Sequence, residues 1–304
     1  MKGNFMEVLD IGMSDKTSWG NKNDFYVDNM FEIYAKSEES FQKYTTFTGI
    51  KDLNSYAEKE VSNINGQVYP ARDSYFFMEF SKDYISFNCS ENAEWIKRLQ
   101  FWIPIVVHTF IRQIIDIGIN NSVNTLTVNS LTRWYEMFSE NGELEGSDFI
   151  SLAIAMLHNI NVRDAMLITI LDEKQEWYDK NSLLDFAIKP HTKEISSNLR
   201  NCLEEKFAQI DEKPNIERAE KACKVLQSMM LITSSIPELS TQIYALLSYI
   251  SWWFNLGNVK HYTDCALKIN PDCSMAKIVR GAAVNDLQPA WLEHFGAPEV
   301  DKNE

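Results

Sequence analysis

Apolar residues recur at every third or fourth position in residues 237–256, the spacing that places them on one face of a helix. Pro237 suits the first turn of this helix, because the N–H that proline lacks would have no partner there. The main apolar face consists of Leu239, Ile243, Leu246, Leu247, Ile250, Trp253 and Phe254. A second face carries Tyr244, Tyr249, Trp252 and Leu256. We therefore predict a helix that is buried on more than one side.

A turn and two shorter helices are predicted next. Gly257 is expected to end the first helix, because glycine takes the left-handed C′ conformation without steric cost. Asn258 is expected to cap a second helix with apolar positions at Val259, Tyr262, Ala266, Leu267 and Ile269. The turn Asn270, Pro271 and Asp272 precedes a third helix. This order resembles a tetratricopeptide unit, but no second copy follows at the expected period, which predicts one helical hairpin and no solenoid.

The same stretch resembles a narrower family. The segments ALLSYISWWFNLGN, ALKINPDCSMAKIVRGA and LQPAW, preceded by SLAIAMLHNINVRDAMLITIL, are similar in order and spacing to the C-terminal half of the bacterial and phage Domain of Unknown Function 4192 family. The resemblance covers about residues 131–291. It implies a fold and an origin in bacteria or their phages, and it implies no activity.

Helical spacing also fills the chain between residue 120 and this hairpin. Helices are predicted at 131–138, 148–158, 162–171, 174–188 and 193–210 and from 214 to 232. Ser147 and Asn161 are the expected caps of the second and third of these. With Asn161 at the cap, Asp164 falls at N3, so we interpret Asp164 as a capping residue and keep a binding or catalytic role of the pair Arg163 and Asp164 as the alternative.

The period of the pattern changes before residue 120. Residues 74–88 alternate in a way that predicts a β-hairpin, with helices at 24–44 and 50–64 before it and a helical run at 92–119 to cover it. The polar residues Asn120, Asn121 and Ser122 mark a candidate boundary. We thus predict a mainly α protein, α+β overall, with an α+β part at 1–120 and an all-α domain at 121–304.

Composition narrows the class of partner. The 304 residues include 43 acidic and 29 basic side chains, a formal charge of −14 that repels phosphate backbones. A general nucleic-acid binder is therefore disfavoured, and a solvated acidic surface is preferred to an acidic decoy of DNA. No signal-peptide pattern opens the chain, and polar residues interrupt the uncharged stretch 239–259, which favours a buried helix over a membrane span. Five scattered cysteines without a C-x-x-C pair predict reduced thiols in a cytoplasm.

Metal and cofactor motifs are absent from the sequence. His261 and Cys265 are four residues apart and Cys273 follows, but a closed zinc site needs four ligands. The glycine-rich phosphate loops and the G-x-S-x-G elbow do not occur. We therefore predict no metal, no cofactor and no catalytic residue.

Two sets of residues remain as candidate sites. The aromatic group Trp252, Trp253, Tyr262 and Trp291 is a candidate partner-binding surface, because adjacent tryptophans point about 100° apart on a helix and one can face solvent. This favours a non-enzymatic cytoplasmic interaction or scaffold protein that binds another protein. The alternative is an enzyme acting on a nucleotide or nucleic acid, with a polar site between the two parts at Arg112, Arg133, Arg163 and Asp164. The sequence names neither the partner nor the oligomeric state.

Overall fold

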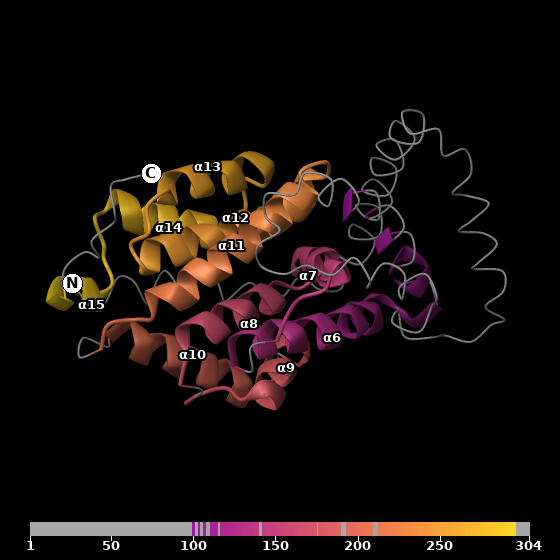
Figure 1. Cartoon of the computed structure of the whole chain (residues 1–304), viewed down its shortest axis with the longest axis horizontal. Helices are drawn as coiled ribbons and strands as arrows, with labels where there is room; N and C mark the ends of the chain where they lie inside the picture. Colours follow the sequence, from indigo (N-terminus) through magenta and orange to yellow (C-terminus); the bar gives the residue numbers. More distant parts are fainter. Residues whose placement is uncertain are drawn as a thin grey trace.

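The protein is described by a computed structural model over residues 99–100, 103, 106–107, 110–114, 116–139, 142–174, 176–189, 193–208 and 212–295. Every regular element in these residues is a helix, so the described part is mainly α (Figure 1). The predicted helices at 24–44 and 50–64 and the predicted β-hairpin at 74–88 lie outside the described residues. The division at residue 120 therefore stays a prediction.

The described helices follow one another through short connections. Their bounds are α6 Ile119–Ser139, α7 Gly146–His158, α8 Ile160–Leu171, α9 Lys180–Ile188, α10 Lys193–Ala208, α11 Ile216–Thr233, α12 Pro237–Trp253, α13 Val259–Ile269, α14 Ser274–Val284 and α15 Ala290–Phe295. None of them is, by itself, long and apolar enough to cross a bilayer; α7 and α8 reach that length only together, across a bend of 120°.

Helix α12 lies at the centre of the array. It contacts α11, α13 and α14 as well as α7 and α8, so it joins the two groups of helices seen in Figure 1. Every residue from Leu239 to Trp253 except Tyr244 is buried. The prediction of a helix buried on more than one side is therefore confirmed, with Pro237 in its first turn.

The end of α12 differs from the prediction. The helix stops at Trp253, and Asn255 takes the left-handed conformation with a φ of 54°. The N–H of Leu256 donates to the carbonyl of Ser251 at 2.9 Å, and the N–H of Asn255 donates to that of Trp252 at 3.4 Å. This is a Schellman turn, in which asparagine replaces the more usual glycine. Gly257 also has a positive φ, 81°, but it belongs to the connection and does not end the helix.

Several predicted starts of helices are corrected by the structure. Helix α7 begins one residue before the expected cap Ser147, with Glu145 and Asp148 forming a capping box. The cap of α8 is Asn159 and not Asn161, whose N–H it accepts at 3.0 Å. Asn159 is the single residue between the two helices, so it ends one and begins the next. The helix expected from residue 174 begins only at Lys180.

The polar run at Asn120 to Ser122 lies inside α6. Its side chains tolerate a helix because they bond to the preceding turn: the hydroxyl of Ser122 donates to the carbonyl of Gly118 at 2.9 Å, and the amide of Asn121 donates to that of Ile117 at 2.8 Å. The polar run therefore forms the first turn of α6, directly after Gly118, which has a φ of 80° and lies outside the helix. The expected helix at 131–138 is the last part of the same element.

Two glycines provide a matched test of the connection after α12. Neither Gly257 nor Gly281 would place an added Cβ within 4 Å of another atom, but only Gly257 has a positive φ. We expect Gly257→Ala to lower the free energy of unfolding by about 1 kcal/mol, because alanine is strained there. Gly281→Ala, within α14, should raise it by about 1 kcal/mol through helix propensity. Urea unfolding of both variants measures this pair, and equal effects of the same sign would contradict the assignment.

Candidate functional site

The aromatic residues predicted to bind a partner all lie in the interior. Trp252, Trp253, Tyr262 and Trp291 are between 2% and 7% exposed. The indole N–H of Trp252 donates to the carbonyl of Leu287 at 2.8 Å, and that of Trp291 donates to the carbonyl of Trp253 at 3.0 Å. The expectation that one indole faces solvent is therefore wrong. Helix α12 is covered on both of the faces that the two adjacent tryptophans occupy.

The predicted polar site is not assembled in the described residues. Arg112 is exposed, Arg133 contacts Asp148 at 3.0 Å, and Arg163 contacts Asp164 at 2.8 Å. Arg163 also donates to the side-chain oxygen of Gln242 in α12 at 2.8 Å. Each arginine thus has a separate environment, and the last two stabilise contacts between neighbouring elements.

Asp164 does not have the capping role that the sequence suggested. Because α8 begins after Asn159, Asp164 lies in the second turn of the helix, beyond the position that can reach back to the cap. Its carboxylate instead pairs with the guanidinium of Arg163, whose side chain is only 5% exposed. The pair orients Arg163 toward α12.

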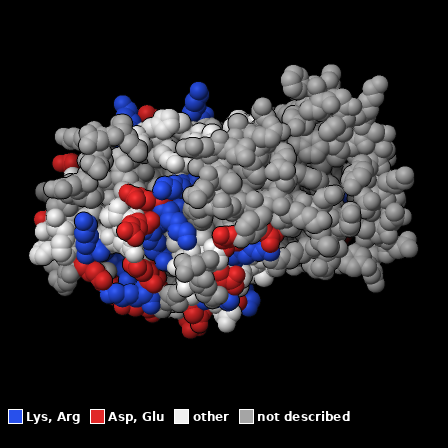
Figure 2. All heavy atoms as spheres, in the orientation of Figure 1, with Lys and Arg blue, Asp and Glu red and all other residues white. Residues whose placement is uncertain are grey.

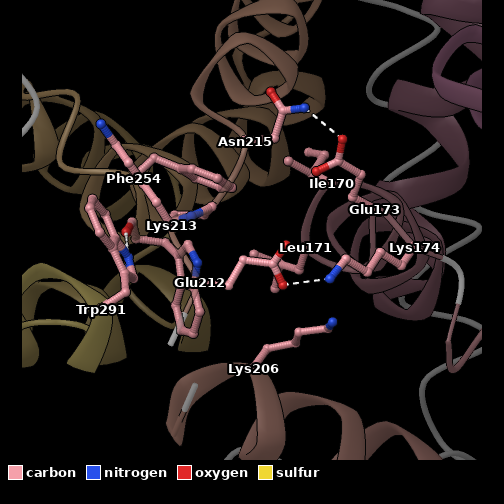
Figure 3. Close-up of a pocket in the computed structure, with 12 residues that line it drawn as sticks. Ile170, Leu171, Glu173, Lys174, Lys206, Glu212, Lys213, Asn215, Phe254 and Trp291 are labelled. Carbon is pink, nitrogen blue, oxygen red and sulfur yellow. Dashed lines mark hydrogen bonds and ion pairs between the residues drawn. The ribbon is translucent and has the colours of Figure 1, made fainter. Parts of the chain in front are cut away.

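A pocket that the sequence did not indicate lies where the end of α8, α10, α12 and α15 meet (Figure 3). We call it the lysine pocket. It is lined by Ile170, Leu171, Glu173, Lys174, Lys206, Glu212, Lys213, Pro214, Asn215, Trp253, Phe254 and Trp291. Its empty space is about 530 Å³, including the part open to solvent. This space is continuous with the solvent.

Two polar contacts cross the entrance of the lysine pocket (Figure 3). The ammonium of Lys174 donates to the carboxylate of Glu212 at 2.6 Å, and the amide of Asn215 donates to that of Glu173 at 2.6 Å. The side chains of Lys174 and Glu212 are 55% and 46% exposed. Both contacts join the connection after α8 to the segment before α11.

Lys206 is buried more deeply than Lys174 and Lys213, the other two lysines of the pocket. Lys206 of α10 is 9% exposed, and its ammonium lies 3.2 Å from Glu176 and 3.6 Å from Asp172. Asp172 also accepts the backbone N–H groups of Glu176, Trp177 and Tyr178, which fixes the connection between α8 and α9. A lysine is rarely buried unless it is paired, so Asp172 both shapes this wall and holds its cation in place.

A thiol and a phenol next to Asp172 are kept protonated by burial. Burial, followed by the charge of Asp172, raises the pKa of the Cys202 thiol to about 12. Burial also raises the pKa of Tyr178, with Cys202 and Asp172 as further causes, and its hydroxyl has no hydrogen-bond partner among the described residues. Both groups are therefore neutral at pH 7, and the charge of this wall comes from its lysine and carboxylates.

The floor of the lysine pocket is aromatic. Trp253, Phe254 and Trp291 are 4% exposed or less, and the indole N–H of Trp291 already has a backbone partner. The floor thus presents ring carbon and no unsatisfied donor. Together with the entrance, it can receive an apolar group flanked by a carboxylate.

Charges of both signs are interspersed over the described part of the face shown in Figure 2. This arrangement gives no continuous row of carboxylates on that face to resemble duplex phosphates. Within the described residues, no three His, Cys, Asp or Glu side chains are grouped to hold a metal ion.

Comparisons of the chain with protein-family models, with curated proteins and with solved structures find no match. The geometry of the site therefore carries the functional argument. Sequence reasoning missed the three lysines of the pocket because they come from three separate segments and share no spacing. The sequence shows acidic and basic residues side by side near Glu212, but such neighbours are common on protein surfaces and do not by themselves indicate a site.

His158 is a buried titratable group outside the lysine pocket. It ends α7, is 8% exposed and packs against the ring of Phe110 at a centroid distance of 5.4 Å. Burial lowers its pKa from 6.5 to about 4. The folded chain therefore keeps this imidazole neutral in a range where the unfolded chain binds a proton.

This shift predicts a dependence of stability on pH. The contribution of His158 is complete above pH 6.5 and is lost as the pH falls toward 4. Between pH 7 and pH 5 we expect a loss of about 2 kcal/mol in the free energy of unfolding. His158→Phe should remove that part of the slope, as urea unfolding at a series of pH values would measure. An unchanged slope would contradict the assignment.

Proposed function

We propose that this chain is a non-enzymatic cytoplasmic interaction or scaffold protein of bacterial or phage origin, which binds another protein. The contact is made at the lysine pocket, which takes a segment carrying an apolar side chain next to a carboxylate. The observation that carries the proposal is the aromatic floor beneath an entrance that an exposed lysine and glutamate close.

The entrance is easily opened. An ion pair between solvent-exposed side chains contributes about 1 kcal/mol or less, so little is lost when Lys174 releases Glu212. A carboxylate of the partner then takes the place of Glu212 on the same ammonium. The pocket lining carries three lysines and two glutamates, so it offers a locally positive surface on a chain whose net charge is −14.

The gain comes from the apolar side chain. Full burial of a leucine or phenylalanine side chain contributes about 2 kcal/mol, more than the ion pair that it displaces. Lys213 is exposed beside the entrance and adds attraction for acidic residues. Because the gain from burying the apolar side chain only slightly exceeds the loss of the ion pair, we predict weak, reversible binding.

The origin and architecture in this proposal rest on the sequence. The resemblance of residues 131–291 to the Domain of Unknown Function 4192 family supports a bacterial or phage origin. The hairpin of α12 and α13 supports a tetratricopeptide-like arrangement, and the α+β part at 1–120 with its β-hairpin belongs to the same proposal. The alternative, an enzyme that uses Arg112, Arg133 and Arg163, gains no support, because each arginine has its own surroundings.

Selection of short displayed peptides on the immobilised full-length protein tests the proposed contact. We expect selected peptides to carry Asp or Glu next to Leu, Phe or Trp. The variant Lys174→Glu with Lys213→Glu should bind them about tenfold more weakly, because the charge at the entrance is reversed. Glu212→Gln should bind them about threefold more tightly, because Lys174 then lacks its internal partner.

A second charge reversal serves as the control. Lys260→Glu with Lys268→Glu changes the total charge by the same amount on exposed positions of α13, outside the pocket lining. It should leave peptide binding unchanged. The proposal is wrong if the selected peptides lack carboxylates, or if the two double variants weaken binding equally while both remain folded by circular dichroism.

A further inference from the structure

The aromatic floor and the carboxylate position of the lysine pocket lie side by side. The rings of the floor are 4% exposed or less, so they close the pocket toward the protein interior, and a partner enters from the solvent side. In Figure 3 the rings of Phe254 and Trp291 lie on one side of Glu212, and Lys174 lies on the other. A carboxylate that replaces Glu212 on the ammonium of Lys174 therefore lies beside the floor.

Two of the lysines in the pocket differ in how firmly they are paired. Lys206 is buried, and its ammonium lies close to two carboxylates that are outside the pocket lining. The ammonium of Lys174 pairs with Glu212, and both of these side chains are about half exposed. The neighbouring Glu173 accepts instead from the amide of Asn215. Of these two lysines, Lys174 is therefore the one that can exchange its partner for a carboxylate from outside.

The position of the carboxylate beside the floor restricts the kind of segment that fits. In an extended peptide the side chains of adjacent residues point to opposite sides, and in a helix they point about 100° apart. A carboxylate side chain next to an apolar residue is thus directed away from the pocket that receives the apolar side chain, unless the peptide bends. In the last residue of a chain, the α-carboxylate and the side chain are attached to the same Cα. Both groups then enter the pocket together without a bend.

We propose that the segment bound in the lysine pocket is the C-terminus of a partner chain that ends in an apolar residue. This inference rests on the proposed function and specifies the group that is bound. The α-carboxylate takes the place of Glu212 on the ammonium of Lys174, and the last side chain covers the aromatic floor. Capture of a terminal carboxylate is a known mode of peptide recognition.

The charges around the pocket also favour a single carboxylate. Three lysines and two glutamates line the pocket, a surplus of one positive charge. One terminal carboxylate matches this surplus. A segment with several acidic side chains brings further negative charge to a chain whose net charge is already −14, and that repulsion opposes binding.

Three labelled peptides of equal length test the inference by fluorescence anisotropy with the full-length protein. The first ends in leucine with a free carboxylate, and the second is its C-terminal amide. The third is an amide that carries aspartate next to leucine inside the chain, and all other positions are glycine or serine. We expect the free acid to bind about tenfold more tightly than its amide and about threefold more tightly than the internal aspartate peptide. Glycine in place of the last leucine should weaken the free acid about tenfold, because the floor is left uncovered.

The variant Lys174→Gln identifies the cation that binds the carboxylate. It should reduce the preference for the free acid over its amide from about tenfold to about twofold, because the charged partner is lost. Lys268→Gln is the matched control, since it makes the same change of charge at an exposed position of α13 outside the pocket lining. The control should leave the preference at about tenfold.

The outcomes separate this inference from the function on which it rests. Equal binding of the free acid and its amide, or a preference that is unchanged in Lys174→Gln, would overturn the inference. If the internal aspartate peptide binds as tightly as the free acid, and Lys174→Gln weakens both equally, the partner uses an internal acidic segment. The inference then fails while the proposed function stands. If no peptide binds and the selection of displayed peptides also yields none, both fail.

Discussion

The burial of α12 is the constraint on which the described structure depends. A helix that is surrounded on nearly all sides must satisfy each of its polar side chains within the protein. Ser240 does so by pairing with the hydroxyl of Thr233 at 2.7 Å, and Ser248 donates to the carbonyl of Ala245 at 2.7 Å. Gln242 accepts from Arg163, which connects α12 to α8. Small hydroxyl residues and one amide thus allow α12 to pack closely against its neighbours.

This constraint also determines where an external group can approach. The middle of α12 is inaccessible, so contacts with solvent occur at its ends and at the single half-buried residue between Leu239 and Trp253. At the C-terminal end, the Schellman turn exposes the carbonyl of Trp253 to the indole of Trp291. That contact brings α15 against the end of the helix and completes the aromatic floor. The lysine pocket is a consequence of how α12 ends.

The sequence predicted elements well where the pattern is local. The period of α12, its start at Pro237 and the order of the last helices could be predicted, because apolar spacing and proline chemistry act within a few residues. Boundaries were less predictable. Asn255 and Gly257 both adopt a positive φ, and only the hydrogen bonds of Leu256 decide which of them ends the helix. Likewise, Asn159 and Asn161 are equivalent as caps until the bend between α7 and α8 is known.

The candidate site could not be predicted for a different reason. Lys174, Lys206 and Lys213 are unremarkable as separate residues of an acidic chain, and their meaning depends on three segments meeting over one floor. The tryptophan pair attracted attention because aromatic residues often form binding surfaces. In a helix buried on both faces, however, the same residues pack in the core of the protein.

The position of Tyr244 follows from the same geometry. It is the one residue of the buried run that reaches the surface, and the helix laid against that surface is α13. His261 and Cys265, one turn apart on α13, share a face of that helix, and the Sγ atom of Cys265 lies 3.9 Å from Nε2 of His261. The spacing of histidine and cysteine was visible in the sequence, but it indicated only an incomplete metal site.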